Sequence, residues 1–137
     1  MIAPEPSGAH VMTIDRLDHI NLRTTQMDDM IAWYVEVLGL EPGARPDFPF
    51  PGAWLYAGKA AIVHLVGTSG DPGIGSEAEL KMEHFALTAT DARAFEARLN
   101  ARNVTFRKSG IAELGVVAYN IRDPDGNHIH VDFKDAN

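Results

Sequence analysis

The chain has 137 residues, of which 45% are hydrophobic and 23% are charged, a size and composition typical of one soluble globular domain. The formal net charge of −7 argues against a nucleic-acid-binding surface, and the absence of cysteine excludes disulfides, cysteine-ligated zinc and thiol catalysis. No segment approaches the roughly 20 consecutive apolar residues that a membrane-spanning helix needs. We therefore expect a protein that binds neither nucleic acid nor membrane.

The amino-terminal stretch MIAPEPSGAH has neither a basic start nor an apolar run, so it does not resemble a signal peptide. We interpret residues 1–13 as a flexible polar tail and expect a cytoplasmic protein. Residues 14–137 are expected to form a single domain.

The first half of this domain predicts a strand, a helix and two further strands. In chain order these are Arg16–Thr24, the helix Met27–Leu38, Gly52–Gly58 and Ala60–Gly67. The helix is indicated by apolar residues that recur along one stripe, and Thr25 with Asp28 forms a capping pair at its start. Gly39 can take the left-handed conformation that ends a helix. The stretch Arg45–Gly52 is too rich in proline for a central strand.

The second half predicts the same order of elements. They are a strand at Lys81–Ala89, a helix at Thr90–Val104, and strands at Leu114–Arg122 and Asn127–Phe133. Thr90 or Asp91 caps the helix, and Asn103 ends it as Gly39 ends the first helix. Between the last two strands, Asp123–Gly126 reads as a tight turn, with proline where φ is near −65° and glycine where positive φ costs little.

The chain is therefore an internal repeat, in which each copy is one unit whose apolar face has to be covered by the other copy. We place module one at about 14–67, a linker at 68–79 and module two at about 80–137. When the copies are aligned, His19 matches His84, and IVHLV matches HIHVD so that His64 matches His130.

Four histidines thus stand at equivalent places in the first and last predicted strands of each module. A single histidine on a sheet is more often an ordinary exposed or half-buried residue. Four imidazoles that converge on one point are different, because protonated rings repel each other and buried neutral rings still need hydrogen bonds. A divalent metal ion removes both difficulties, so we predict a metal site.

The doubled pattern, with LDHINL opening the first copy, EHFALTA opening the second and RDPDGNHIHV closing it, resembles the vicinal oxygen chelate superfamily. That group includes glyoxalase I, extradiol dioxygenases, and the fosfomycin- and bleomycin-resistance proteins. The resemblance extends from about Arg16 to Phe133. It implies an α+β fold in which two βαβββ modules form a cup-shaped, incompletely closed barrel, often completed in a homodimer. It also implies metal ligands at His19, His64, His84 and His130.

The chain departs from its relatives at two of these ligands. Most relatives have glutamate at the position of His130, and glyoxalase I also has glutamate at the position of His64. A set made only of imidazoles is neutral, so it leaves the charge of the ion uncompensated and favours an anionic ligand. Imidazole suits Zn, Fe, Ni or Co better than Mg or Ca.

Further candidates follow from strand alternation and from the resemblance. Asp132 could act as a general base or orient an imidazole, although a solvated carboxylate at a strand end is the simpler interpretation. The candidate substrate-binding residues are Asn21, Arg23, Trp54, Tyr56, Asn120 and His128. For Arg23 an ordinary surface position is equally compatible with the sequence, and for the aromatic residues so is packing in the core or at a subunit interface.

Three functions remain open at this point. The first is a metal-dependent enzyme, either a glyoxalase-like lyase or isomerase or a ring-cleavage dioxygenase, that binds two adjacent oxygens of a small molecule. The second is a protein that sequesters a small molecule without catalysis, as bleomycin-resistance proteins do. The third is a structural zinc site closed by four histidines, since catalytic zinc keeps one position open.

Overall fold

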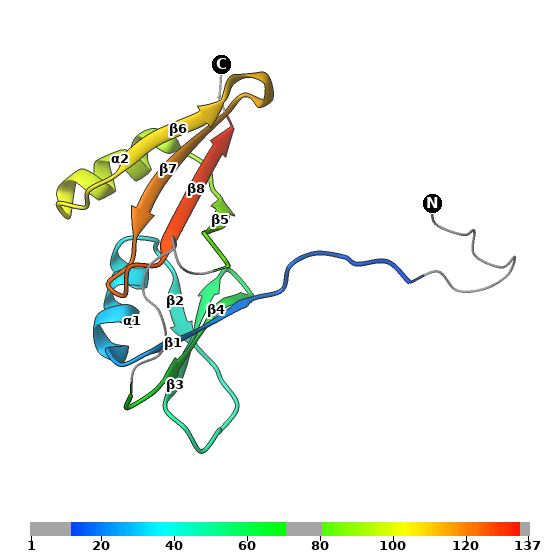
Figure 1. Cartoon of the computed structure of the whole chain (residues 1–137), viewed down its shortest axis with the longest axis vertical. Coiled ribbons are helices and arrows are strands. Elements are labelled where there is room, and N and C mark those ends of the chain that lie inside the picture. Colours follow the sequence, from blue (N-terminus) through cyan, green and yellow to red (C-terminus); the bar gives the residue numbers. More distant parts are fainter. Residues whose placement is uncertain (1–11, 71–80, 135–137) are drawn as a thin grey trace, which may run out of the picture.

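The computed structural model describes residues 12–70 and 81–134 (Figure 1). The predicted tail at 1–13 and the predicted linker at 68–79 lie mostly outside the described residues. In chain order the elements are β1 (Ile20–Thr24), α1 (Met27–Glu36), β2 (Glu41–Gly43), β3 (Gly52–Ala57), β4 (Ala60–Gly67), β5 (Phe85–Thr88), α2 (Ala92–Ala101), β6 (Arg107–Ile111), the short 3-10 helix η1 (Ala112–Leu114), β7 (Val116–Arg122) and β8 (His128–Lys134).

The strands form two mixed sheets of four strands each, one from each module. Their orders are β1-β4-β3-β2 and β5-β8-β7-β6, and in both the first and last strands of the module pair in parallel. Figure 1 shows the two open sheets following one another along the long axis of the molecule, with both helices on the same side in this view. This is the predicted α+β architecture of two βαβββ modules, and neither sheet closes into a barrel.

The strands β2 and β6 were not predicted, because neither has an apolar alternation. The three residues of β2 are all exposed and include a proline, and β6 is the mostly exposed sequence RKSGI. Both are edge strands, so each needs only one hydrogen-bonding neighbour and buries little apolar surface.

The helix α1 begins at Met27 as predicted and ends as predicted, but its predicted capping pair is wrong. The helix is capped at Gln26 without a side-chain hydrogen bond, and the hydroxyl of Thr24 accepts a bond from the backbone N–H of Gln26 instead. The pair Thr25 and Asp28 therefore does not form a capping box. Gly39 has a φ of 71°, and its N–H donates to Val35, so the helix ends as expected.

The predicted ends of α2 are both confirmed. The side chain of Asp91 accepts a hydrogen bond of 3.0 Å from the backbone N–H of Ala94. Asn103 has a φ of 56°, and the N–H of Val104 donates back to Leu99. The turn before β8 is also as predicted, with Gly126 at a φ of 86° and its N–H donating to Asp123.

One hydrophobic core joins the two modules. It combines side chains of α1, both sheets and α2, among them Met30, Leu55, Leu99 and Ile129, each of which is fully buried. In β8 the residues Ile129, Val131 and Phe133 enter this core, so that the alternating residues His128, His130 and Asp132 point to the opposite face. Burial of the apolar face thus determines where the histidines lie.

Candidate metal centre

In the first sheet, His19 and His64 form a stacked pair. Their ring centroids are 3.8 Å apart, and the ring of Trp54 stacks on the other side of His64 at 4.0 Å. The strand register explains this arrangement, because His64 in β4 lies opposite Asn21 in β1 and opposite Trp54 in β3. His19 directly precedes β1 rather than lying within it, and it shares the face of Asn21 by the two-residue period.

In the second sheet, His84 and His130 form the equivalent stacked pair, with centroids 3.9 Å apart. His84 directly precedes β5, as His19 precedes β1. His128 joins this pair at 5.3 Å from His84 and 4.8 Å from His130. One potential ligand atom from each of these three histidines lies within 4.8 Å of the others, and among the described residues this is the one group of three or more potential ligands so close together.

The histidine that precedes the first strand of each sheet donates a hydrogen bond from Nδ1 to a carboxylate. His19 Nδ1 donates to Asp18 at 2.7 Å, and His84 Nδ1 donates to Glu83 at 2.6 Å. A carboxylate on one ring nitrogen fixes the tautomer and makes the other nitrogen a better metal ligand. Neither carboxylate was among the predicted site residues. The signal was present, since an acidic residue immediately precedes both repeat-equivalent histidines.

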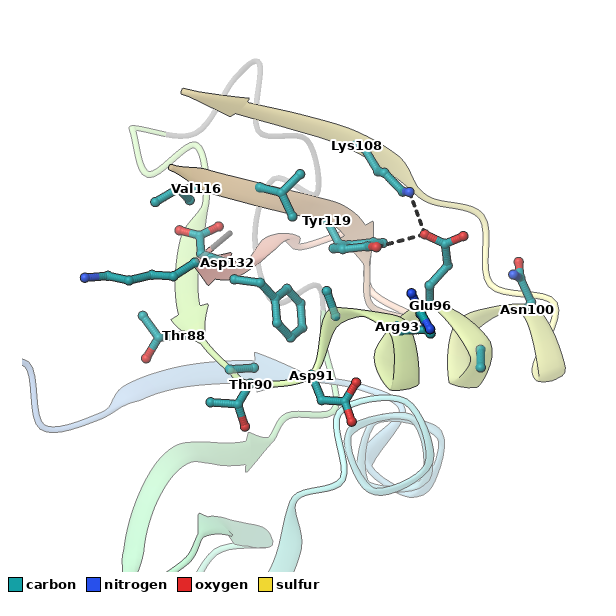
Figure 2. Close-up of a pocket in the computed structure, with 16 residues that line it drawn as sticks. Thr88, Thr90, Asp91, Arg93, Glu96, Asn100, Lys108, Val116, Tyr119 and Asp132 are labelled. Carbon is teal, nitrogen blue, oxygen red and sulfur yellow. Dashed lines mark hydrogen bonds and ion pairs between the residues drawn. The ribbon is translucent and has the colours of Figure 1, made fainter. Parts of the chain in front are cut away.

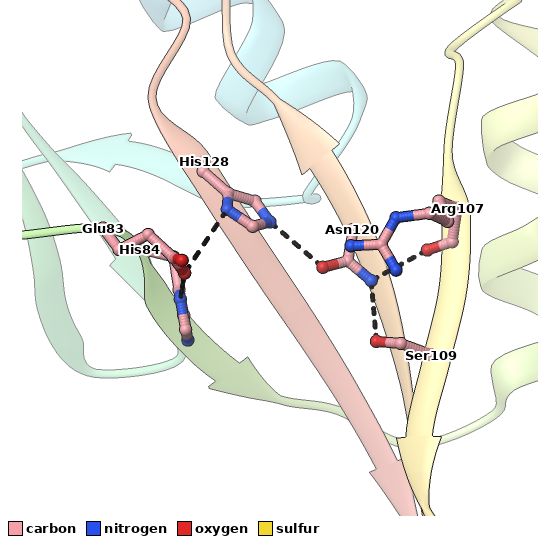
Figure 3. Close-up of polar contacts among 6 residues, drawn as sticks. All are labelled: Glu83, His84, Arg107, Ser109, Asn120 and His128. Carbon is pink, nitrogen blue, oxygen red and sulfur yellow. Dashed lines mark hydrogen bonds and ion pairs between the residues drawn. The ribbon is translucent and has the colours of Figure 1, made fainter. Parts of the chain in front are cut away.

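The rings of His64 and His128 are also fixed through one nitrogen. His64 Nε2 donates to the carbonyl of Ala61 at 3.1 Å. His128 Nε2 lies 3.0 Å from Oδ1 of Asn120 (Figure 3). A neutral imidazole that donates through one nitrogen carries a lone pair on the other nitrogen, which is the atom that can bind a metal ion.

The surroundings of His64 and His130 favour the neutral form of these two rings. Burial lowers the pKa of His64, and His19 lowers it further. Burial likewise lowers the pKa of His130, with additional contributions from His84 and His128. Neutral rings with oriented lone pairs are the donor set that divalent first-row ions such as Zn, Ni, Co and Fe accept. The residues present therefore fit such an ion.

The predicted ligands are brought together in two pairs rather than in one group of four. His84 and His130 meet on the second sheet, and His19 and His64 meet on the first. The third histidine of the close group is His128, which was predicted as a substrate-binding residue. His19 and His84 are still substantially exposed, with side-chain exposures of 38% and 34%, whereas His128 is 9% exposed.

Two cavities are lined by predicted substrate-binding residues. One of about 480 Å³ is lined by Asn120 and His128 together with Trp33 and residues of β6 and the segment before it. Another of about 380 Å³ is lined by Asn21, Arg23, Phe50 and Val66. Four of the six predicted substrate-binding residues thus line cavities.

The remaining two predicted substrate-binding residues lie on β3. Trp54 stacks on His64, as described above. The hydroxyl of Tyr56 donates to the carbonyl of Ala44, so this group is already used within the fold.

A larger cavity of about 1380 Å³ lies away from the histidines, between α2 and the second sheet (Figure 2). At one end Glu96 binds both Lys108, at 2.7 Å, and the hydroxyl of Tyr119, at 2.8 Å. Asp132, the candidate base, belongs to its lining, and the buried Oδ1 of Asp132 has no hydrogen-bond partner within the described residues. None of the predicted metal ligands lines this cavity, so its size does not identify it as the reactive site.

Within residues 12–70 and 81–134, no helix has both the length and the apolar character that crossing a bilayer requires.

Comparison with known proteins agrees with this fold. The family model described as "Glyoxalase/Bleomycin resistance protein/Dioxygenase superfamily" matches residues 16–131. The protein Glyoxylase I 4 of Arabidopsis thaliana is 24% identical over 120 residues, which are 84% of this chain and 68% of that protein.

Two solved structures illustrate the structural likeness. The glyoxylase/bleomycin resistance protein/dioxygenase domain from Frankia sp. EAN1pec has a TM-score of 0.74 at 16% identity, with coverage of 89% of this chain and 93% of that one. Lactoylglutathione lyase from Agrobacterium tumefaciens has a TM-score of 0.64 at 21% identity, with coverage of 90% and 97%. At these identities the structures establish the fold alone. Because the family model spans most of the sequence, the chain belongs to the Glyoxalase/Bleomycin resistance protein/Dioxygenase superfamily.

Proposed function

We propose that the protein is a metal-dependent enzyme that acts on a small molecule by binding two adjacent substrate oxygens to a histidine-ligated divalent ion. The observation that carries the proposal is the stacked pair of His84 and His130, with Glu83 on Nδ1 of His84. A histidine whose second nitrogen donates to a carboxylate is the usual form of a metal-ligating imidazole.

In this proposal His84 and His130 bind the ion directly. His19 and His64 are the other two sequence-predicted ligands, and they are held in the same way on the first sheet. Because that pair lies on a separate sheet, we propose that it faces the bound substrate from a second copy of the chain in a homodimer. When bound, the ion supplies Lewis-acid stabilisation of negative charge on the substrate oxygens.

The remaining groups of the site bind substrate or move a proton. Asn21 and Arg23 are exposed on the face of His64 and can donate hydrogen bonds to anionic oxygens. Asp132 lies two residues beyond His130 on the same face of β8, and its buried Oδ1 is the candidate acceptor for a substrate proton.

The names of the relatives suggest the substrate class. Lactoylglutathione lyase and Glyoxylase I 4 support a lyase or isomerase that acts on a small thioester-like or hydroxy-carbonyl compound. Ring-cleavage dioxygenation is the other reaction to test, and the identity of the ion separates the two. Iron would favour oxygen chemistry, whereas zinc, nickel or cobalt would favour the lyase or isomerase reaction.

The test begins with metal analysis of protein purified without added metals. The protein is then treated with a chelator, reloaded separately with Zn, Ni, Co and Fe(II), and assayed with lactoylglutathione and with catechol. We expect about one ion per chain and turnover of one compound that is lost in His84→Ala and His130→Ala. Tight binding of a small molecule by metal-free protein, without turnover in any metal form, would instead support a sequestering protein.

We further propose that the protein is a cytoplasmic homodimer. Light scattering coupled to gel filtration tests the dimer, with and without the ion, and a monomer in both conditions would refute it. Fractionation of cells that express the full chain tests the compartment.

A further inference from the structure

We infer that His128 is a metal ligand, and that the second sheet of a single chain holds the ion by itself through His84, His128 and His130. This inference rests on the proposed function only in assuming that the protein uses a divalent metal. It differs from the sequence-predicted set, because His128 takes the place that His19 and His64 were expected to fill.

The three rings are already close to the spacing that one ion requires. Their potential ligand atoms lie within 4.8 Å of one another. Metal–nitrogen bonds to imidazole are about 2.0–2.1 Å long, so two nitrogens on one ion are at most about 4 Å apart. The potential ligand atoms therefore lie only slightly farther apart than in a metal-bound set, and binding requires them to approach one another.

The orientation of His128 is set by Asn120. The amide nitrogen of Asn120 donates to the carbonyl of Arg107 and lies 2.9 Å from the hydroxyl of Ser109, so its Oδ1 has to face His128 (Figure 3). An amide oxygen can only accept, which means that Nε2 of His128 carries the proton and Nδ1 carries the lone pair. Asn120 is therefore a positioning residue that presents Nδ1 of His128 for coordination.

Glu83 adds negative charge on the same side. Its Oε1 accepts from Nδ1 of His84 at 2.6 Å and lies 4.0 Å from Nδ1 of His128. A carboxylate at this distance compensates part of the charge that a divalent ion would bring to three neutral imidazoles. It also leaves Nε2 of His84 as the nitrogen available to the ion.

The first sheet lacks the equivalent parts. In the repeat alignment the position of His128 is held by Ile62, so module one supplies two imidazoles instead of three. The position of Asn120, opposite the last-strand histidine, is held by Trp54, which stacks on His64 and has no acceptor oxygen. The two halves of the chain are therefore unequal, and the second half alone has a complete set of ligands.

Three imidazoles leave an octahedral ion three further positions. Two of them can take adjacent substrate oxygens, and the third can take water or one more ligand. The cavity of about 480 Å³ is lined by His128 and Asn120 but not by His84 or His130, so it adjoins the site on the side of Asn120. Four histidines are thus not needed to hold the ion or to admit a bidentate substrate.

The test compares metal affinity among four full-length proteins: the wild type, His128→Phe, Asn120→Leu and the double variant His19→Phe/His64→Phe. Each is freed of metal and titrated with Zn²⁺ in competition with a chromophoric chelator, and circular dichroism checks the fold. We expect the double variant to bind one Zn²⁺ with nearly wild-type affinity. Asn120→Leu should lose about 10–100-fold, as expected for the partner of a ligand, and His128→Phe should lose more than that.

A spectroscopic measurement on the wild type gives an independent readout that does not depend on how a variant folds. Long-range ¹H–¹⁵N spectra should show His128 as the Nε2–H tautomer, with the Nδ1 resonance shifting when Zn²⁺ is added. An unchanged Nδ1 resonance would overturn the assignment.

The outcomes separate the inference from the proposed function. If His128→Phe binds Zn²⁺ as tightly as the wild type, or if the double variant loses the ion, the inference is wrong while the metal-dependent function stands. If the wild type binds none of the ions tested, both the proposed function and the inference fail.

Discussion

The hydroxyl of Tyr34 donates a hydrogen bond of 2.7 Å to the carboxylate of Asp123 in the interior of the protein. Tyr34 belongs to α1 of the first module, and Asp123 begins the turn that leads into β8. The same carboxylate accepts two bonds from the backbone N–H groups of Asp125 and Asn127. This single contact therefore ties the strand that carries His128 and His130 to a helix from the other half of the chain.

Replacing Tyr34 by phenylalanine should lower the free energy of unfolding by about 1–3 kcal/mol, because the buried carboxylate of Asp123 loses a donor. Urea unfolding at pH 7 measures the change. Tyr56→Phe is the matched control, since its hydroxyl bond to Ala44 is exposed, and we expect a change within about 0.5 kcal/mol. Equal effects of the two substitutions would contradict a special role for the buried contact.

The effect of Tyr34→Phe should also depend on pH. Burial raises the pKa of Asp123, and the hydrogen bonds from Asn127 and Tyr34 oppose this rise. Because the pKa of Asp123 is higher in the folded state than in the unfolded state, the protein loses stability as the pH rises from the unfolded-state pKa of 3.8 through the folded-state pKa. Loss of the Tyr34 hydroxyl raises that pKa further. The destabilisation should therefore be largest near neutral pH and become smaller as the pH approaches 4, which unfolding curves across this range can check.

Removing the carboxylate behind His84 should weaken metal binding. Glu83→Gln replaces the charged acceptor of the hydrogen bond from His84 Nδ1 by a neutral amide. The tautomer of His84 is then held less firmly, and we expect the dissociation constant for Zn²⁺ to rise about 10–100-fold. Asp18→Asn makes the equivalent change behind His19 in module one. It should have little effect if the second sheet holds the ion, so a larger effect for Asp18→Asn would point to the first sheet instead.

Binding of the ion should stabilise the folded protein, because His84, which precedes β5, and the ligands on β8 come together only in the native state. At a free concentration of Zn²⁺ or Ni²⁺ one hundred times the dissociation constant, the expected gain in free energy of unfolding is about 2.7 kcal/mol. Thermal unfolding of chelator-treated protein, before and after addition of the ion, measures this gain. The double variant His84→Ala/His130→Ala should show none; an equal gain there would mean that the ion binds elsewhere.

The cap of α2 offers a test of the fold that is independent of the metal. Asp91→Ala removes the side-chain acceptor from the N–H of Ala94 and should cost about 1 kcal/mol of stability. Thr90→Ala, one residue earlier, should cost much less, because the structure assigns the cap to Asp91. Chemical unfolding of the two variants distinguishes these capping positions, and a larger cost for Thr90→Ala would show that the cap is assigned to the wrong residue.

The sequence predicted those features that depend on periodicity and on special backbone angles. The apolar stripe of α1, the alternation in β1 and β8, and the positive φ at Gly39 and Gly126 are all local properties, and the structure has each of them. The edge strands β2 and β6 were missed because their stability comes from a neighbouring strand rather than from their own pattern.

The candidate site was predicted only in part, because part of it also depends on neighbouring strands. The repeat identified His84 and His130 as candidate ligands, but it gave no indication of His128, whose repeat-equivalent position in module one is Ile62. The role of His128 depends on the register that sets Asn120 opposite His130 and Arg107 opposite Asn120. That register is decided by the packing of three strands, and no residue pattern within one strand encodes it.

The parallel pairing of β5 with β8 also bears on the order in which the molecule forms. These are the first and last strands of module two, so the rings of His84 and His130 can stack only when the chain segment with the helix and both intervening strands has closed into a loop. Pairing between segments so far apart in sequence is slow, and we expect it late in folding. The stacked rings are therefore a built-in reporter of completed assembly, and their ring-current shifts during refolding would mark the moment at which module two becomes native.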